Sequence, residues 1–187
     1  ENEKFDCIFH FSGLTKAKRL TDFDRVNFEL TKNLVDAIDT NITKLIFLSS
    51  FAAHGPGEEV NFTQSKVSDE NKPNTAYGRS KLKAENYINE NFKGKYVILR
   101  PTGVYGPRET DYFVFFQTID NHIEPYLGFV PQRLTFVYSK DLVQVCIKAF
   151  ESEVSGKTYF VSDGKMYLDS EYAAISKQIL NKKTLKL

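Results

Sequence analysis

Three short apolar runs, separated by helical segments, constrain the fold of this chain more than any other feature. They cover residues 5–11 (FDCIFHF), 44–50 (KLIFLSS) and 95–100 (KYVILR). Brief apolar runs of this kind are typical of strands buried in a parallel sheet. Because helical segments lie between them, successive strands must be joined by crossover connections. The order predicts an α/β fold, a parallel sheet with helices on both faces.

Two helical segments link these runs. The first spans residues 21–40, and Thr21 followed by Asp24 resembles a capping box at its start. Its apolar stripe consists of Phe23, Val26, Leu30, Leu34 and Ile38. The second is capped by Asn74 or Thr75 and ends near Phe92. Later in the chain we expect helices over 111–121, 141–150 and 169–182, the last capped by Asp169 or Ser170, and strands over 134–139 and 157–162.

Composition excludes several classes of protein. The 187 residues carry a formal net charge of +1, so no general attraction to nucleic acid or an anionic membrane is expected. No apolar run approaches the roughly 18 residues of a transmembrane helix, and no signal-peptide pattern is present. Cys7 and Cys146 are interpreted as small core residues in a reducing compartment. We expect a cytoplasmic protein whose partner is a small molecule.

Polar residues gather where the predicted strands end. Ser49 and Ser50 end the second strand, Tyr77 and Lys81 lie in the first two turns of the helix after it, and the segment 101–103 (PTG) follows the third strand. Ligands of open parallel sheets bind outside these carboxyl ends. Tyrosine and lysine four residues apart share a helix face, and a nearby ammonium favours the phenolate. A tyrosine with a lowered pKa can take a proton from a substrate alcohol, although the pair alone is also common on solvent-exposed helices.

The order of motifs HFSG, VN, LIFLSS, AYGRSK and LRPTGVYGPRE resembles the extended short-chain dehydrogenases/reductases of the NAD-dependent epimerase/dehydratase family. The likeness covers residues 5–108 and continues more weakly through FVYSKDLV and TYFVSDG. It implies a Rossmann-like sheet whose first part is missing from this chain. By this reading residues 1–108 are the C-terminal portion of the dinucleotide-binding domain. Residues 109–187 are mostly a small mixed α/β substrate-binding lobe, with 156–163 returning to the sheet.

The resemblance also implies roles for individual residues. Ser50, Tyr77 and Lys81 would be catalytic. The cofactor, NAD with NADP left open, would contact Phe11, Ser12, Gly13, Lys16, Asn27, Ser49, Tyr77, Lys81, Pro101 and Thr102. The substrate, a nucleotide sugar in the favoured reading, would contact Ser50, Gly103, Arg108 and Arg133. No metal is expected, and the helices carrying Asn27 and Tyr77 would form a homodimer.

Three departures from the family pattern keep alternatives open. The glycine-rich pyrophosphate turn is absent, so we expect the chain to be part of a longer enzyme. Gly103 stands where nucleotide-sugar members usually carry Asn, which resembles members acting on apolar alcohols, such as 3β-hydroxysteroid dehydrogenases and dihydroflavonol reductases. Arg133 lies one residue further from Asp141 than the usual phosphate-binding arginine. A protein that senses a dinucleotide without catalysis is the rival from another class.

The remaining candidate residues have simpler interpretations. His10 lies in a strand and is expected to be a hydrogen-bonded core histidine or a neighbour of the cofactor. His54 and His122 have no acidic or cysteine partners at ligand spacing. The aromatic run at residues 112–116 is interpreted as core, with a substrate-contacting role left open.

Overall fold

The protein is described by a computed structural model over residues 5–39, 44–57, 63–125 and 132–186. Its main sheet has four parallel strands in the order β1-β2-β3-β8. The strands are β1 (Cys7–His10), β2 (Lys44–Leu48), β3 (Tyr96–Pro101) and β8 (Lys157–Val161). The predicted α/β class with a parallel sheet is therefore confirmed.

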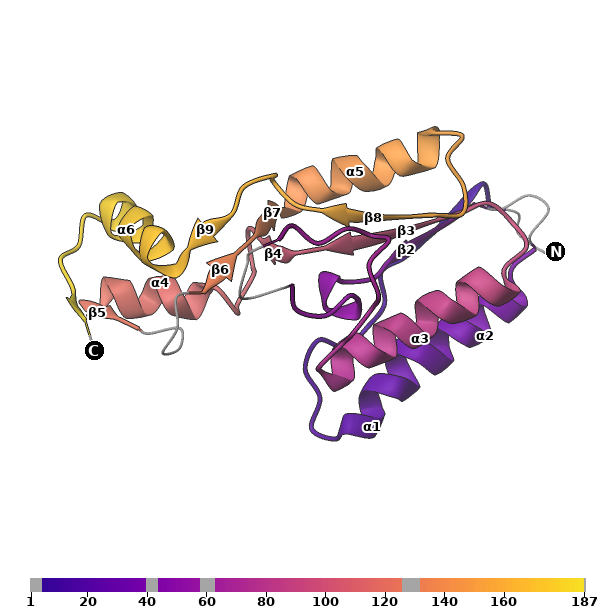
Figure 1. Ribbon diagram of the computed structural model, residues 1–187, viewed down its shortest axis with the longest axis horizontal. Coiled ribbons are helices and arrows are strands. Elements are labelled where there is room, and N and C mark those ends of the chain that lie inside the picture. The colour runs from indigo at the N-terminus through magenta and orange to yellow at the C-terminus, as the bar shows by residue number, and fades with distance from the viewer. Residues whose placement is uncertain (1–4, 40–43, 58–62, 126–131, 187) are drawn as a thin grey trace. The chain divides into compact units, whose positions relative to one another are not determined.

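Helices cover both faces of this sheet. In Figure 1, α2 (Leu30–Ala37) and α3 (Ala76–Asn91) lie side by side below the strands, and α5 (Ser139–Glu151) lies above them. The central strands are buried: Leu45, Ile46 and Phe47 have no exposed surface. Burial on both faces explains why these strands are apolar runs without alternation.

Lys44 is a buried charged residue at the start of β2. Its ammonium donates hydrogen bonds to the backbone carbonyls of Ala149, Phe150 and Ser152, where α5 ends. The last carbonyls of a helix lack partners within the helix and carry partial negative charge. Lys44 therefore fastens the end of α5 to the sheet.

The first predicted helix is not one continuous α-helix. It consists of α1 (Leu20–Phe23), a π-helical turn over Asp24–Glu29 (η1) and α2, and the predicted end at Thr40 lies outside the described residues. The expected capping box was wrong: the N-cap is Arg19, and no side chain caps it. The helix therefore begins one residue before Thr21 and contains a wider turn that sequence periodicity does not reveal.

The buried face of this helical segment also differs from the apolar stripe. Asn27 and Thr31 are fully buried, whereas Leu30 is 44% exposed. Wider π-helical spacing rotates the face that meets α3, and hydrogen bonds compensate the buried polar groups for lost water. The sequence periodicity therefore placed Leu30 wrongly in the packed face.

The chain folds as two compact units. The first contains residues up to Thr102 together with Leu142–Val161, and the second contains Gly103–Asp141 and Ser162–Leu187. The strand β8 belongs to the first unit, and so does most of α5, which the sequence analysis grouped with the second lobe. The α5 residues group with the sheet because the carbonyls at their end are held by Lys44.

The second unit is built from two helices and short strand pairs. The helices α4 (Phe113–Asp120) and α6 (Asp169–Leu180) pack through Phe115, Ile119 and Ala173. Two strand pairs are parallel: β4 (Gly103–Tyr105) with β7 (Phe136–Tyr138), and β5 (Ile123–Glu124) with β10 (Leu185–Lys186). A third pair, β6 (Arg133–Leu134) with β9 (Tyr167–Leu168), is antiparallel.

The predicted caps of α6 were wrong. The N-cap residue is Leu168, and the Glu171 carboxylate accepts a hydrogen bond from its backbone N–H at 2.8 Å. Asp169 lies inside the first turn, where its carboxylate accepts from the Ser170 N–H. The N-terminus of α6 is therefore stabilised by a glutamate three residues after the N-cap, which accepts from the backbone of the cap residue.

Candidate active site

The site is organised around the end of β2 and the start of α3. Ser50 follows β2 and is the N-cap of a short 3₁₀ turn over Phe51–Ala53 (η2). Its hydroxyl accepts a hydrogen bond from the Ala52 N–H at 3.1 Å. Of the two predicted caps, Asn74 and Thr75, the structure selects Thr75, which caps α3 by accepting from the Gly78 N–H at 3.0 Å. Tyr77 and Lys81 thus lie in the first two turns of a helix with a fixed start.

Gly78 allows this helix to approach the end of β2 closely. A Cβ atom at position 78 would lie 2.1 Å from the backbone oxygen of Ala52, far inside contact distance. Only glycine permits the first turn of α3 to rest against the turn that follows Ser50. This contact brings Tyr77 to Ser50.

The Tyr77 phenol lies beside the Ser50 side chain. Burial raises the pKa of the Tyr77 phenol above its ordinary value, and the hydrogen bond with the Ser50 side chain lowers it in part. Lys81 does not contribute, contrary to the sequence-based expectation that its ammonium would lower the tyrosine pKa. The reason is the position of the ammonium, which is directed to another partner.

Lys81 is buried, with 4% of its surface exposed. Its Nζ donates to the Leu48 carbonyl at 2.9 Å and lies 5.0 Å from the centre of the Phe47 ring. Burial lowers the pKa of Lys81 to about 8, although the Glu85 carboxylate acts in the opposite direction. The side chain is thus a fixed cation near neutral pH that loses its proton far more readily than an exposed lysine.

Asn27 holds the segment that follows β1. Its Oδ1 accepts from the Leu14 N–H at 2.7 Å, and its Nδ2 donates to the Leu14 carbonyl at 3.1 Å and to Ser80 Oγ at 2.9 Å. A Cβ at Gly13 would come within 3.0 Å of Asn27 Oδ1 and 3.1 Å of Lys81 Nζ. The amide therefore joins the segment to α3, and Gly13 keeps space open beside the lysine.

Ser49 points away from this space into a buried network. Its hydroxyl donates to the Glu85 carboxylate, which also accepts hydrogen bonds from Arg100 at 2.6–3.2 Å. Arg100 Nη1 donates to Asn71 Oδ1 at 2.9 Å. Glu85 and Arg100 are 2% and 3% exposed, so the network joins α3, β2 and β3 inside the first unit. The Ser49 hydroxyl is therefore held inside this network, and we do not expect it to contact a cofactor.

The other candidate cofactor residues lie near strand ends of the first unit. Phe11 and Ser12 are exposed just beyond β1, as is Lys16. Pro101 ends β3, and the Thr102 N–H donates to the Val161 carbonyl at 3.0 Å. These positions are compatible with contact to a bound molecule, and each remains a prediction.

The candidate substrate residues Gly103, Arg108 and Arg133 belong to the second unit. A Cβ at Gly103 would lie 2.3 Å from the Tyr112 hydroxyl, so this phenol occupies the space of a side chain at position 103. Arg108 is exposed with a positive φ of 72°, and Arg133 Nη1 donates to Met166 Sδ at 3.3 Å. Their contact with substrate remains a prediction.

His10 is a buried, hydrogen-bonded histidine. Its Nε2 lies 2.8 Å from Thr31 Oγ1. Because the Thr31 hydroxyl donates to the Asn27 carbonyl, its oxygen is left to accept from the histidine N–H. Burial, together with the Lys81 charge, lowers the pKa of His10 to about 4. Within the residues that the structure describes, no three His, Cys, Asp or Glu side chains are grouped to hold a metal ion.

Sequence reasoning missed three residues that support this site: Thr31, Ser80 and Glu85. Ser80 accepts from Asn27 and donates to the Tyr77 carbonyl at 2.7 Å, so it links the segment after β1 to the first turn of α3. A faint signal was available, because Ser80, Lys81 and Glu85 share one face of a helix that must pack on a sheet. Polar residues on a packing face indicate a buried network.

The model of the family described as "NAD dependent epimerase/dehydratase family" matches residues 1–162. The chain belongs to this family. UDP-glucose 4-epimerase of Vibrio cholerae is 30% identical over 164 residues, covering 83% of this chain and 49% of the relative. The dTDP-D-glucose 4,6-dehydratase of Mus musculus is 28% identical, with 85% and 47% covered.

Solved structures support the fold of this epimerase/dehydratase chain. UDP-glucuronic acid 4-epimerase from Bacillus cereus, in complex with NAD, superposes with a TM-score of 0.85 at 20% identity, covering 97% of this chain and 61% of that one. UDP-N-acetylglucosamine 4-epimerase from Methanobrevibacter ruminantium gives 0.82 at 24% identity, with 97% and 63% covered. The chain spans about half the length of the curated relatives it matches. Among its described residues, no helix has the length and apolar character needed to cross a membrane.

Proposed function

We propose that this chain supplies the Ser-Tyr-Lys site of an NAD-dependent epimerase or dehydratase that acts on a hydroxyl or keto carbon of a nucleotide sugar. The observation that carries the proposal is the Tyr77 phenol beside Ser50, on the same helix as buried Lys81 and at the carboxyl end of a parallel strand. Ligands of open α/β sheets bind at such ends. Family membership and the two nucleotide-sugar enzymes among its relatives support the substrate class.

The residues at this end fit a dinucleotide. Gly13 leaves room beside Lys81 Nζ that a Cβ would fill, and Asn27 fixes the backbone of the segment that borders this room. Lys81 would hold ribose hydroxyls, while Phe11, Ser12, Pro101 and Thr102 would line the nicotinamide end. NAD, when bound there, accepts and returns the substrate hydride. The NAD in the solved Bacillus cereus enzyme supports this choice of cofactor.

Tyr77 would move the proton of the substrate hydroxyl. With its pKa raised by burial, the phenol is protonated near neutral pH and is prepared to donate a proton to a substrate oxygen. To act as a base, Tyr77 needs its phenolate form to be stabilised, and Ser50 already provides part of this stabilisation. The Lys81 ammonium would add to it if it were released from the Leu48 carbonyl. Ser50 would also donate to the reacting oxygen.

A second candidate is an oxidoreductase for an apolar alcohol. The specific observation is at Gly103, where nucleotide-sugar members usually carry Asn. The Tyr112 hydroxyl occupies the space that a side chain at position 103 would need, so an aromatic residue stands there in place of an amide. Turnover of nucleotide sugars compared with apolar alcohols, followed by nicotinamide absorbance, separates the two. Binding of NAD without hydride transfer to either class would instead favour a dinucleotide sensor.

The decisive experiment is Tyr77→Phe in the full-length protein. Loss of the phenol oxygen should lower kcat by at least about 100-fold, the usual contribution of a positioned acid–base group, while NAD binding changes little. Tyr87→Phe is the matched control, because Tyr87 is on the same helix and its hydroxyl donates to Asp36 at the surface. Wild-type turnover in Tyr77→Phe would refute the catalytic assignment.

Two further expectations belong to this proposal. A homodimer through the helices carrying Asn27 and Tyr77 is supported by Leu20 and Leu30, which are 71% and 44% exposed on that helical segment. Light scattering on the full-length protein tests the dimer. A cytoplasmic location accords with two free cysteines, Cys7 and Cys146.

A further inference from the structure

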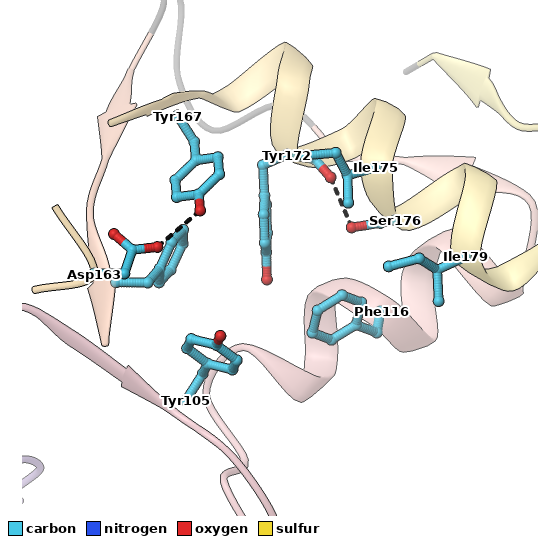
Figure 2. A pocket seen from close by; sticks show the side chains of 9 residues that line it. Tyr105, Phe116, Asp163, Tyr167, Tyr172, Ile175, Ser176 and Ile179 are labelled. Atoms are coloured by element: carbon cyan, nitrogen blue, oxygen red, sulfur yellow. Dashed lines mark hydrogen bonds between the residues drawn. The ribbon is translucent and has the colours of Figure 1, made fainter. Parts of the chain in front are cut away.

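The second unit contains a cavity of about 250 Å³ that the proposed catalytic site does not use. Figure 2 shows its nine lining side chains. They come from β4, β7, β9, α4, α6 and the turn after β8, so the second unit alone forms the cavity. The inference below goes beyond the proposed function and does not depend on Ser50, Tyr77 or Lys81.

Aromatic rings form most of the wall. They are Tyr105, Phe116, Phe136, Tyr167 and Tyr172. Tyr172 stacks on Phe136 with 5.1 Å between ring centres, and Phe116 lies 5.7 Å from Tyr172 at a steep angle. Packing of each ring against its neighbours fixes their orientation, so the cavity presents aromatic surface in several directions.

Two phenol groups on this wall have no partner within the part of the chain that the structure describes. The hydroxyls of Tyr105 and Tyr172 make no hydrogen bond there, and Figure 2 shows them turned toward the same space. The Tyr167 hydroxyl, in contrast, donates to Asp163 at 2.7 Å. Polar groups that converge on an apolar cavity are the features that orient a bound molecule.

Asp163 is the one charged residue among the nine that line the cavity. Its carboxylate accepts from the Tyr167 hydroxyl and from the Lys165 backbone N–H, and forms no ion pair with any described residue. Burial, with Tyr112 and the Glu109 charge, raises the pKa of Tyr172 to about 12, so this phenol stays neutral. The surroundings are therefore electronegative and contain no lining cation.

We propose that this cavity binds a small ligand through an alkylammonium group. The faces of electron-rich rings attract cations, and Asp163 adds a formal negative charge. The same charge and the lack of a lining lysine or arginine disfavour a phosphate group. A cavity of about 250 Å³ has the volume of roughly eight waters, which suits a trimethylammonium group and its short chain but not a nucleotide.

Choline and its neutral isostere 3,3-dimethylbutan-1-ol test the proposal, since they share a shape and differ in charge. The probes are titrated into the protein while the tyrosine ring resonances are followed by NMR. We expect saturable choline binding in the millimolar range and at least about 5-fold weaker binding of the isostere, the size of a partly desolvated cation–π contribution. Equal affinities, tighter binding of the alcohol, or no saturation by choline would overturn the proposal.

Two variants separate charge from shape. Asp163→Asn keeps an oxygen for the Tyr167 hydroxyl and removes the charge, so it should weaken choline binding at least about 3-fold and leave the alcohol unaffected. Asp120→Asn is the control, because Asp120 lies on α4 and pairs with Lys182 outside the lining set. Unchanged choline affinity in Asp163→Asn, with the fold intact by circular dichroism, would exclude the carboxylate from the site.

Discussion

Lys81 is held between two opposing electrostatic influences. Burial favours its neutral form, and the Glu85 carboxylate one turn further along α3 favours the ammonium. Glu85 is fixed by Arg100 and Ser49, neither of which lies where a ligand would bind. A buried ion pair behind the site therefore helps to set the protonation state of the residue proposed to hold the cofactor.

This arrangement predicts a lysine that titrates near pH 8. In NMR titrations of side-chain resonances, Lys81 should lose its proton at about pH 8, and Glu85→Gln should move the midpoint to lower pH, since it removes the charge that favours the ammonium. Glu90→Gln, an exposed glutamate on the same helix, should leave the midpoint in place. A Lys81 midpoint near the ordinary lysine value would show that burial does not control this group.

At the scale of elements, the π-helical turn η1 decides how the helix after β1 meets α3. The turn contains Asn27, and the Thr31 hydroxyl donates to the Asn27 carbonyl at 2.7 Å. The wider turn places the Asn27 amide where it forms hydrogen bonds both with the Leu14 backbone, in the segment after β1, and with Ser80 on α3. π-Helical turns are uncommon and occur often at functional sites, in accord with the position of this one.

Asn27→Ala should therefore loosen the segment after β1. Three hydrogen bonds are lost and the Leu14 backbone groups lose their partner, so we expect a destabilisation of about 2–3 kcal/mol in urea unfolding. Hydrogen exchange at the Leu14 amide should accelerate more than exchange in β2. Asn91→Ala, an exposed asparagine on α3, should cost less than about 0.5 kcal/mol. Similar losses in both variants would argue that the hydrogen bonds of the Asn27 amide do not hold the segment after β1.

At the scale of the whole molecule, a buried neutral histidine makes stability depend on pH. The pKa of His10 is about 4 in the folded protein, against an ordinary 6.5. Between these values the unfolded chain binds a proton that the folded protein does not, so stability falls as the pH drops from 6.5 to 4. The shift corresponds to a loss on the order of 3 kcal/mol.

Urea unfolding at pH 7 and pH 4 checks this contribution. His10→Gln can still donate to Thr31 but does not titrate, so its stability should decline less than that of the wild type over this interval. An equal decline in both proteins would show that His10 does not account for the acid sensitivity.

The amino-acid sequence determined the architecture of the sheet, because buried parallel strands must be apolar throughout and leave runs such as residues 44–48. It also determined the order of Ser50, Tyr77 and Lys81, since the site is built from short motifs at the ends of those strands. It narrowed the cap of α3 to Asn74 or Thr75, whose signal is local, and the structure selects Thr75. It did not predict the π-helical turn or the caps of the first and last helices, where competing local residues are equally suitable.

Tertiary structure alone decided the direction of each side chain and its electrostatics. Four-residue spacing placed Tyr77 and Lys81 on one face, but the carbonyl of Leu48 and the ring of Phe47 determine where the ammonium lies. The same holds for Ser49 and Ser50, adjacent in sequence, which point to Glu85 and to Tyr77 respectively. A pKa depends on burial and on every nearby charge, and these come from residues far apart in the chain, so no local pattern encodes it.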